Sequence, residues 1–149
     1  MKYCEIKYKT NAASINSIIE HFEKCADLFN PPLYTYVNIK EYAKKIFTNA
    51  VTFEAWDGSR LVGLAAAYFN NLDEKIAFWT NLSVLDKYRT KGIAFKLTSS
   101  IIDYGIKNGF KRIDFEVNKI NIDVIKFHKY HGAVVKGNKN EYTLMAYYL

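Results

Sequence analysis

The chain has 149 residues, of which 50% are hydrophobic and 24% charged, with only seven glycines and two prolines. This composition excludes a disordered or fibrous protein and predicts a single domain over residues 1–149. Lysine and arginine outnumber aspartate and glutamate by 21 to 15, which gives a formal charge of +6 and favours an anionic ligand or partner.

The two cysteines and the chain ends exclude several classes of protein. Cys4 and Cys25 are too few for a disulfide framework, and we expect both to be free buried thiols. No Cys/His cluster offers a metal-ligand set. The N-terminus lacks the apolar run of a signal peptide, and no stretch is long and apolar enough to span a membrane. The sequence therefore predicts a cytoplasmic protein without a metal or a membrane partner.

The first half of the chain alternates strand and helix patterns. Residues 3–8 alternate as a strand, and an apolar stripe at helical spacing runs from Ile15 to Phe29, where two prolines end the helix. We expect His21 on the polar, exposed side of this helix. A shorter helix is expected over residues 39–47.

The rest of the chain predicts a mixed sheet. Asp57-Gly58 is a hairpin turn signal, and Gly109 is placed to end a helix. The strand–helix–strand unit from Ile76 to Val117 implies parallel pairing, and hairpins surround it. The expected elements are strands over 51–56, 61–69, 76–85 and 113–117, helices over 92–108 and from Asn121 (as N-cap) to Gly132, and a terminal hairpin of 133–135 and 142–148 across a polar loop, 136–141.

A strand-to-helix loop is the first segment that suggests chemistry. Between Val84 and Ala94 a strand ends, a short basic loop follows, and a helix begins. Unpaired N–H groups and the dipole at a helix N-terminus suit a phosphate, and Gly92 allows close backbone approach. Positive charge would come from Lys87, Arg89, Lys91 and Lys96. Taken alone, R-x-x-G-x-A is a weak pattern, and it is neither a P-loop nor GxGxxG.

A second segment, one helix and one strand later, makes the first one specific. Glu116-Val117, Asn121, Ile125 and Gly132 follow in register with Val84, Arg89, Gly92 and Ala94. Together they resemble the GNAT superfamily of acyl-CoA N-acyltransferases, with its motifs V-x-P-x-x-R/Q-x-x-G-x-G/A and N-x-x-A-I-x-x-Y-x-x-x-G-F. The resemblance is close from Ile76 onward and is mainly one of element order before it. It implies an α/β fold with a mostly antiparallel mixed sheet, flanking helices and a splayed parallel strand pair.

The resemblance implies acetyl-CoA as acyl donor and assigns residues to it. The loop would bind the pyrophosphate, and the preceding strand would bind the pantetheine arm. Asn121 would lie beside the pantetheine or the thioester, and Lys126 and Lys129 could face the adenosine phosphate. The implied cofactor-binding residues are Leu82, Ser83, Val84, Arg89, Thr90, Lys91, Gly92, Ile93, Ala94 and Asn121.

The departures from the family pattern concern the catalytic residues. Asp86 replaces the usual proline, Val124 replaces an alanine, and His128 stands where a tyrosine often serves as general acid. Glu116 matches a general base used in part of the family, and a solvated strand-end carboxylate is the alternative. His128 could act as acid, as base or in packing. Tyr130 is the fallback acid.

The acceptor implied by the resemblance is a primary amine of a small molecule. Phe29–Tyr36 and 136–141 would line its entrance, with contributions from Trp56, Phe78 and Trp79. An aromatic, weakly basic mouth would suit an amino sugar, a nucleotide-linked sugar, an amino acid or polyamine, or a peptide N-terminus. An acetyl-CoA-binding sensor without catalysis is the alternative function. Dispersed lysines argue against nucleic acid, and a monomer or homodimer is expected.

Overall fold

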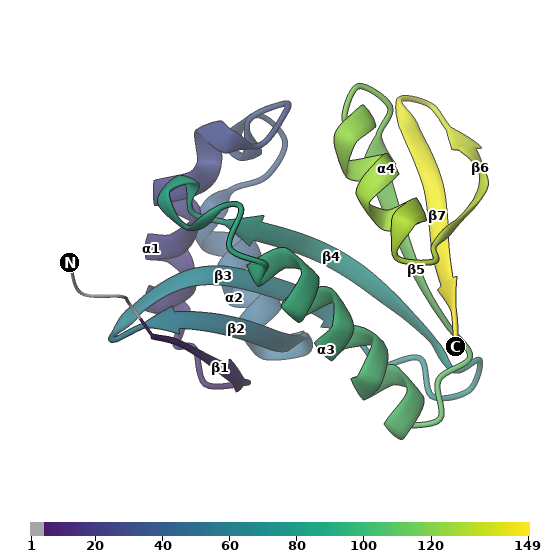
Figure 1. Ribbon diagram of the computed structural model, residues 1–149, viewed down its shortest axis with the longest axis horizontal. Coiled ribbons are helices and arrows are strands. Elements are labelled where there is room, and N and C mark those ends of the chain that lie inside the picture. The colour runs from purple at the N-terminus through teal and green to yellow at the C-terminus, as the bar shows by residue number, and fades with distance from the viewer. Residues whose placement is uncertain (1–4) are drawn as a thin grey trace.

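The computed structural model describes residues 5–149, so the predictions for Tyr3 and Cys4 lie outside the described residues. Figure 1 shows the chain as one twisted sheet with helices on both faces. The elements are β1 (Ile6–Thr10), α1 (Ile15–Cys25), η1 (Ala26–Leu28), η2 (Leu33–Thr35), α2 (Ile39–Asn49), β2 (Val51–Asp57), β3 (Arg60–Tyr68), β4 (Ile76–Val84), η3 (Asp86–Tyr88), α3 (Ile93–Lys107), β5 (Arg112–Asn118), α4 (Ile122–Tyr130), β6 (Val134–Lys139) and β7 (Tyr142–Tyr148).

The seven strands form one sheet in the order β1-β2-β3-β4-β5-β7-β6, and β4–β5 is the parallel pair among antiparallel neighbours. The predicted mixed sheet and its parallel pair are thereby confirmed. The parallel ladder consists of three residue pairs, from Ile76↔Arg112 to Phe78↔Asp114. Beyond Phe78 the two strands diverge, as Figure 1 shows, and backbone pairing across the middle of the sheet stops.

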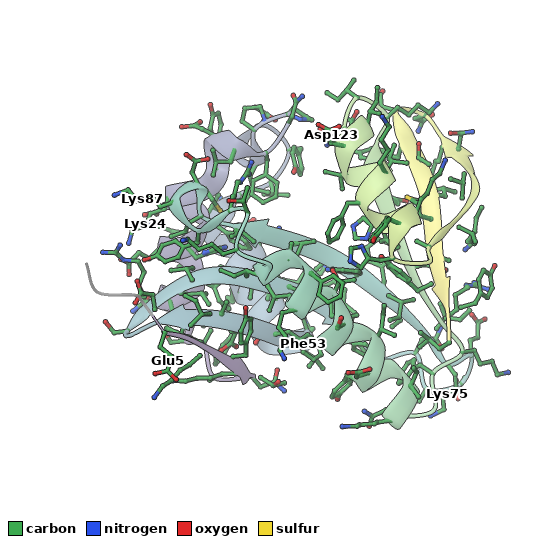
Figure 2. All side chains as sticks on the ribbon, viewed as in Figure 1. Glu5, Lys24, Phe53, Lys75, Lys87 and Asp123 are labelled. Carbon is green, nitrogen blue, oxygen red and sulfur yellow. The ribbon has the colours of Figure 1, made fainter. Side chains whose placement is uncertain are left out.

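The two faces of the sheet are covered by different helices. Phe53 of β2 packs edge-on against Tyr104 of α3, with ring centroids 5.6 Å apart (Figure 2). The next residue, Glu54, points to the other face and accepts a hydrogen bond from the N–H of Ala13, just before α1. Because side chains alternate along a strand, α3 lies on one face and α1 with α2 on the other. Figure 1 shows the same two layers.

A bulge in β4 changes which residues face each layer. Ala66 pairs with Asn81 and Ala67 with Trp79, so Thr80 is an extra residue without a partner in β3. Before the bulge, Trp79 points to the α3/α4 face and packs against Phe115 of β5, 5.6 Å away. After it, the alternation is inverted, since an inserted residue shifts the period of two. Asn81 and Ser83 therefore face α1 and α2.

The aromatic residues explain two parts of the core. Under α3, Phe53, Phe69, Tyr104 and Phe110 form successive edge-to-face contacts with centroids 4.7 to 5.6 Å apart. Under α4, the cluster consists of Trp79, Phe115, Tyr147 and His128. Such pairs add to the stability gained by burying apolar area, which gives part of the aromatic content a structural role.

His21 is buried, with 1% of its surface exposed, and the expectation of a surface histidine was wrong. The buried positions of α1 are Ile18, His21, Phe22 and Cys25, which share one helical face. His21 lies in this stripe because it is three residues after Ile18 and four before Cys25. Its polar character suggested the opposite face, although a buried partner for the ring was available. Cys25 is a free buried thiol as expected.

The terminal hairpin is longer than expected. Residues 136–139 continue β6 and pair with β7, whereas the sequence suggested a polar loop over 136–141. β6 is an edge strand, so its polar side chains remain in water while its backbone pairs. Lys136 is an extra residue between Val135 and Gly137, and Asn140 takes a positive φ of 53° in the tight turn.

Candidate functional site

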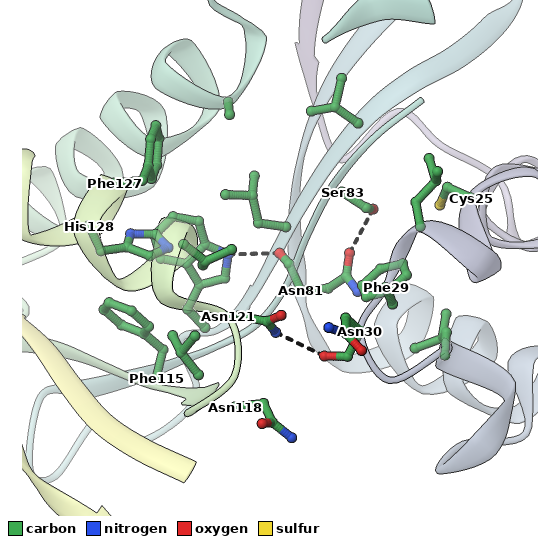
Figure 3. A pocket seen from close by; sticks show the side chains of 18 of the residues that line it. Cys25, Phe29, Asn30, Asn81, Ser83, Phe115, Asn118, Asn121, Phe127 and His128 are labelled. Carbon is green, nitrogen blue, oxygen red and sulfur yellow. Dashed lines mark hydrogen bonds between the residues drawn. The ribbon is translucent and has the colours of Figure 1, made fainter. Parts of the chain in front are cut away.

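A cavity of about 760 Å³ lies where β4 and β5 part. Its walls are the segment between α1 and α2, the second half of β4 with its loop to α3, β5, and the first turns of α4. Figure 3 shows these walls facing one another across the divergence of the strands. The cavity therefore occupies the place where the sheet lacks backbone hydrogen bonds.

The N-terminus of α3 opens onto this cavity. Gly92 is its N-cap, with a φ of 78° that L-residues rarely adopt, and no atom lies within 4 Å of the position that a Cβ would take. The N–H groups of the first turn have no partners within the helix. Arg89, Thr90, Gly92, Ile93 and Ala94 all line the cavity. This combination suits a bound polyanion.

The lysines that were expected to add positive charge at the phosphate site do not line the cavity. Lys91 is exposed and lies outside it, and Figure 2 places Lys87 on the outer side of the loop. Lys96 turns toward β1, where its ammonium lies 5.6 Å from the centroid of the Tyr8 ring. Lys126 and Lys129 are exposed and do not line the cavity either. Arg89 is therefore the cationic side chain in the described lining.

Asn121 links the two walls of the cavity. Its side chain makes no N-cap bond to α4, contrary to expectation. Instead, Nδ2 donates to the carbonyl oxygen of Asn30 at 2.9 Å, across 91 positions of sequence (Figure 3). The loop between α1 and α2 is thereby held against the start of α4, over the divergence of the strands.

Glu116 faces the side of the cavity that is formed by α1 and α2. Its neighbours Phe115 and Val117 are buried, and Phe115 packs against His128 of α4 with ring centroids 4.5 Å apart. Alternation places Glu116 and Asn118 on the opposite face. Tyr142 is paired with Asn118 across β5–β7 and lines the same wall.

A buried polar network lies behind this wall. His21 donates from Nδ1 to the carbonyl of Leu61 at 3.1 Å, and its Nε2 lies 2.8 Å from Oγ of Ser83. Burial lowers the pKa of His21 to about 4, so the ring is neutral at pH 7. Ser83 Oγ is also 2.9 Å from Oδ1 of Asn81 (Figure 3). Ser83 and Asn81 line the cavity and His21 supports them from behind.

His128 lines the cavity from α4, but its environment disfavours a charged ring. Only 3% of its surface is exposed, and Nδ1 lies 2.7 Å from the hydroxyl of Tyr147. Burial lowers the pKa of His128 to about 4, and the nearby His131 contributes to the shift. At neutral pH the ring is therefore uncharged and holds no extra proton for a leaving group.

Tyr130 and the expected hairpin loop lie outside the cavity. Tyr130 is 86% exposed at the end of α4, and residues 136–141 are absent from the lining. Of the three aromatic residues expected at the acceptor entrance, Phe78 and Trp79 line the cavity. Trp56 is buried in another part of the core, where its indole N–H donates to Glu54.

A family model described as the acetyltransferase (GNAT) family matches residues 15–133, which is more than half of the chain. The chain belongs to the GNAT acetyltransferase family. Membership makes it an acyltransferase that uses acetyl-CoA. The α3 N-terminus and the open space above Gly92 fit the phosphates of that donor. No curated protein sequence matches the chain significantly.

Solved structures share the fold at low identity. An acetyltransferase of the GNAT family from Staphylococcus aureus Mu50 has a TM-score of 0.78 and 15% identity, covering 97% of this chain and 99% of that one. The PaiA N-acetyltransferase of Thermoplasma acidophilum, crystallised with coenzyme A, has a TM-score of 0.75, 14% identity and the same coverages. The ribosomal-protein-S18-alanine N-acetyltransferase of Escherichia coli has a TM-score of 0.73 and 16% identity over 94% and 92%.

Residues 5–149 were also compared with the requirements of a metal site and of a membrane-spanning helix. Within residues 5–149, no group of three His, Cys, Asp or Glu side chains could hold a metal ion. No helix in the same range is long and apolar enough to cross a membrane.

Sequence reasoning missed several residues that line the cavity. The bulge turned Asn81 toward α1 and α2, and simple alternation could not show this. The missed lining residues include Cys25, Tyr42, Thr80, Asn81, Asn118, Phe127 and Tyr142. For Asn118 and Tyr142, the same-face spacing with Glu116 and the expected terminal hairpin were available signals.

Proposed function

We propose that this chain transfers the acetyl group of acetyl-CoA to the primary amine of a small acceptor. The observation that carries the proposal is a single cavity that joins the α3 N-terminus to the carboxyl group of Glu116. The donor's phosphates need the α3 N-terminus as an anion-binding site, and an attacking amine needs the Glu116 carboxylate as a base. Both are reached through the opening between β4 and β5.

On the donor side, the loop from Arg89 to Ala94 binds the pyrophosphate through backbone N–H groups and the Arg89 side chain. Leu82 and Val84 face the same side as α3, because they pair with Ala65 and Gly63 of β3. The backbone of β4 beyond Phe78 is not paired with β5, although Tyr42 and Trp79 donate to the carbonyl oxygens of Thr80 and Asn81. The remaining backbone groups of this edge support binding of the pantetheine amides. Lys91 acts only through its backbone N–H.

On the acceptor side, Glu116 acts as general base. An amine attacks a thioester only when it is neutral, so the proton that it loses needs an acceptor nearby. Glu116 lines the cavity on the face that α1 and α2 cover. The new C–N bond forms as the C–S bond breaks, and coenzyme A leaves as the thiol after taking up a proton. His128 shapes the opposite wall as a neutral ring, and Tyr130 has no role.

A sensor that binds acetyl-CoA without turnover is the second candidate. The observation that favours it is His128, which stands at the position of the family's tyrosine and is uncharged at neutral pH. Free coenzyme A released in the presence of an amine separates the two functions. Tight binding of acetyl-CoA with no release on any amine would support the sensor.

The test combines binding with turnover. Acetyl-CoA should raise the melting temperature of the protein, and Gly92→Asp should abolish this rise because it places a carboxylate at the phosphate site. Gly58→Asp is the matched control, since Gly58 also has a positive φ, of 58°, but lies in the β2–β3 turn.

In the turnover arm, free coenzyme A is measured across a panel of primary amines. Glu116→Gln should lower kcat by about 100-fold, within the range for loss of a general base. Glu141→Gln, an exposed residue outside the cavity, should have no effect. No stabilisation by saturating acetyl-CoA would contradict the proposal.

A further inference from the structure

We infer that the acceptor carries no negative charge close to its reacting nitrogen. Simple alkyl amines fit this requirement, and so do amino acids whose carboxyl group is bound as an amide or within an aminoacyl group. Free α-amino acids and phosphorylated or nucleotide-linked amino sugars do not. The inference rests on the proposed function, because it concerns the acceptor half of that site. It also corrects the expectation of a weakly basic mouth.

The charges in the cavity are unevenly distributed. Among the described residues that line it, the charged side chains of Asp, Glu, Lys and Arg are Arg89, Glu116 and Asp123. Arg89 belongs to the loop before α3, which the donor's phosphates occupy. Asp123 lies in the first turn of α4 (Figure 2). Although the whole chain carries a charge of +6, the described residues that line the cavity beyond Arg89 include two carboxylates and no lysine or arginine.

The acceptor side can be separated from the donor side by strand alternation. Phe78 pairs with Tyr68 on the face of α1 and α2, and after the bulge Asn81 and Ser83 lie on that same face. Glu116, Asn118 and Tyr142 face it from the other wall. The side chains presented to the acceptor are thus aromatic rings, hydroxyls and amides, with Glu116 as the charged group.

The remaining described polar groups on this side are uncharged, and several already have hydrogen-bond partners within the wall. The Tyr42 hydroxyl lies 2.7 Å from Oγ1 of Thr80 and 2.9 Å from its carbonyl oxygen, so its hydrogen is used within the wall. Asn121 donates to Asn30, and Ser83 stands between His21 and Asn81. A carboxylate next to the reacting amine would meet Glu116 without a compensating cation. Two like charges about 5 Å apart repel strongly even when water screens them in part.

The experiment compares acceptors that differ by about one negative charge (a carboxylate) or about two (a phosphate) but have amines of similar basicity. Ethanolamine is compared with glycine, and glucosamine with glucosamine 6-phosphate, in the coenzyme A release assay. The uncharged member of each pair should have a kcat/KM at least about tenfold higher, and the ratio should fall as ionic strength rises. Equal or higher kcat/KM for glycine or the phosphorylated sugar would overturn the inference while leaving the proposed function intact.

A variant tests the cause of this preference. Asn118→Lys places a cation beside Glu116 and should reduce or reverse the preference for the uncharged member. Asn138→Lys makes the same substitution on β6, at an exposed position outside the cavity, and should leave the ratio unchanged. An unchanged ratio in Asn118→Lys that still binds acetyl-CoA would contradict the inference. Absence of turnover with every amine would overturn the proposed function and this inference with it.

Discussion

The two parts of the sheet differ in how they are held. β1 to β4, with α1, α2 and α3, form a continuous antiparallel ladder, whereas β5 to β7 with α4 join it through the three parallel pairs from Ile76 to Phe78. Of the largest fully buried side chains, all but Ile113 and Met145 belong to the first part. The first part is thus the main core and the second a smaller unit beside it. The cavity lies at their junction, where the backbone of β4 is not paired with β5.

The largest expected effect concerns Glu54, in the first part. Its carboxyl oxygens accept from the N–H groups of Ala12 and Ala13, from Thr52 and from Trp56, and the residue is 0% exposed. Glu54→Ala leaves these donors unpaired and should lower the free energy of unfolding by about 3–5 kcal/mol in urea titrations. Glu20→Ala, which removes a surface pair with Lys24, should leave the free energy of unfolding almost unchanged. Similar losses in both variants would mean that this network contributes little.

A second prediction compares one buried histidine from each part. The pKa values of His21 and His128 are lowered by burial from 6.5 to about 4 in the folded protein. Between pH 6.5 and 4 the unfolded chain therefore binds more protons, and stability should fall as pH falls. Each residue should contribute a loss of up to about 3 kcal/mol across this window. His21→Leu and His128→Leu should each reduce the pH dependence, measured by urea unfolding from pH 7 to 4.5. If the pH dependence is unchanged in one variant, the part of the sheet that contains that histidine is open to water.

The smallest predicted loss of stability tests whether the first part positions the donor site. A Cβ on Gly63 of β3 would lie 2.7 Å from Cγ2 of Ile93, in the first turn of α3. Because Ile93 is β-branched and buried, Gly63→Ala should push the start of α3 outward and cost about 1–3 kcal/mol. It should also weaken binding of acetyl-CoA, measured by calorimetry. Gly137→Ala, in β6 with no atom within 4 Å, should change neither quantity. Unaltered donor binding in Gly63→Ala would show that the loop alone sets the phosphate site.

The order of elements could be predicted because each has a local signal. Hydrophobic periodicity, the Asp57-Gly58 turn and Gly109 marked strands and helices, and Gly92 marked the start of α3. The two motifs in register then indicated the fold. These signals depend on residues close in sequence, which is why they could be read without the structure.

The site could be predicted only in part, because much of it depends on contacts between distant residues. His21 is buried because Leu61 and Ser83 supply hydrogen-bond partners 40 and 62 positions away. Asn121 is the N-cap residue of α4 as expected, but its side chain bonds to Asn30 instead of making a capping bond. His128 matches a motif position, but its neutral state follows from the aromatic cluster around it. No local pattern contains this information.

The bulge at Thr80 has a consequence for how acceptor specificity can diverge. Because it inverts the alternation within β4, Leu82 and Val84 lie on the proposed donor side, whereas Phe78, Asn81 and Ser83 lie on the proposed acceptor side. The two sets interleave along one strand but face opposite layers. Substitutions on the acceptor side can therefore accumulate without altering donor binding. Deletion or insertion of a residue in the regular stretch between Asn81 and Val84 would instead move Ser83 and Val84 to the opposite faces, so the length of this stretch is under stronger constraint than its composition.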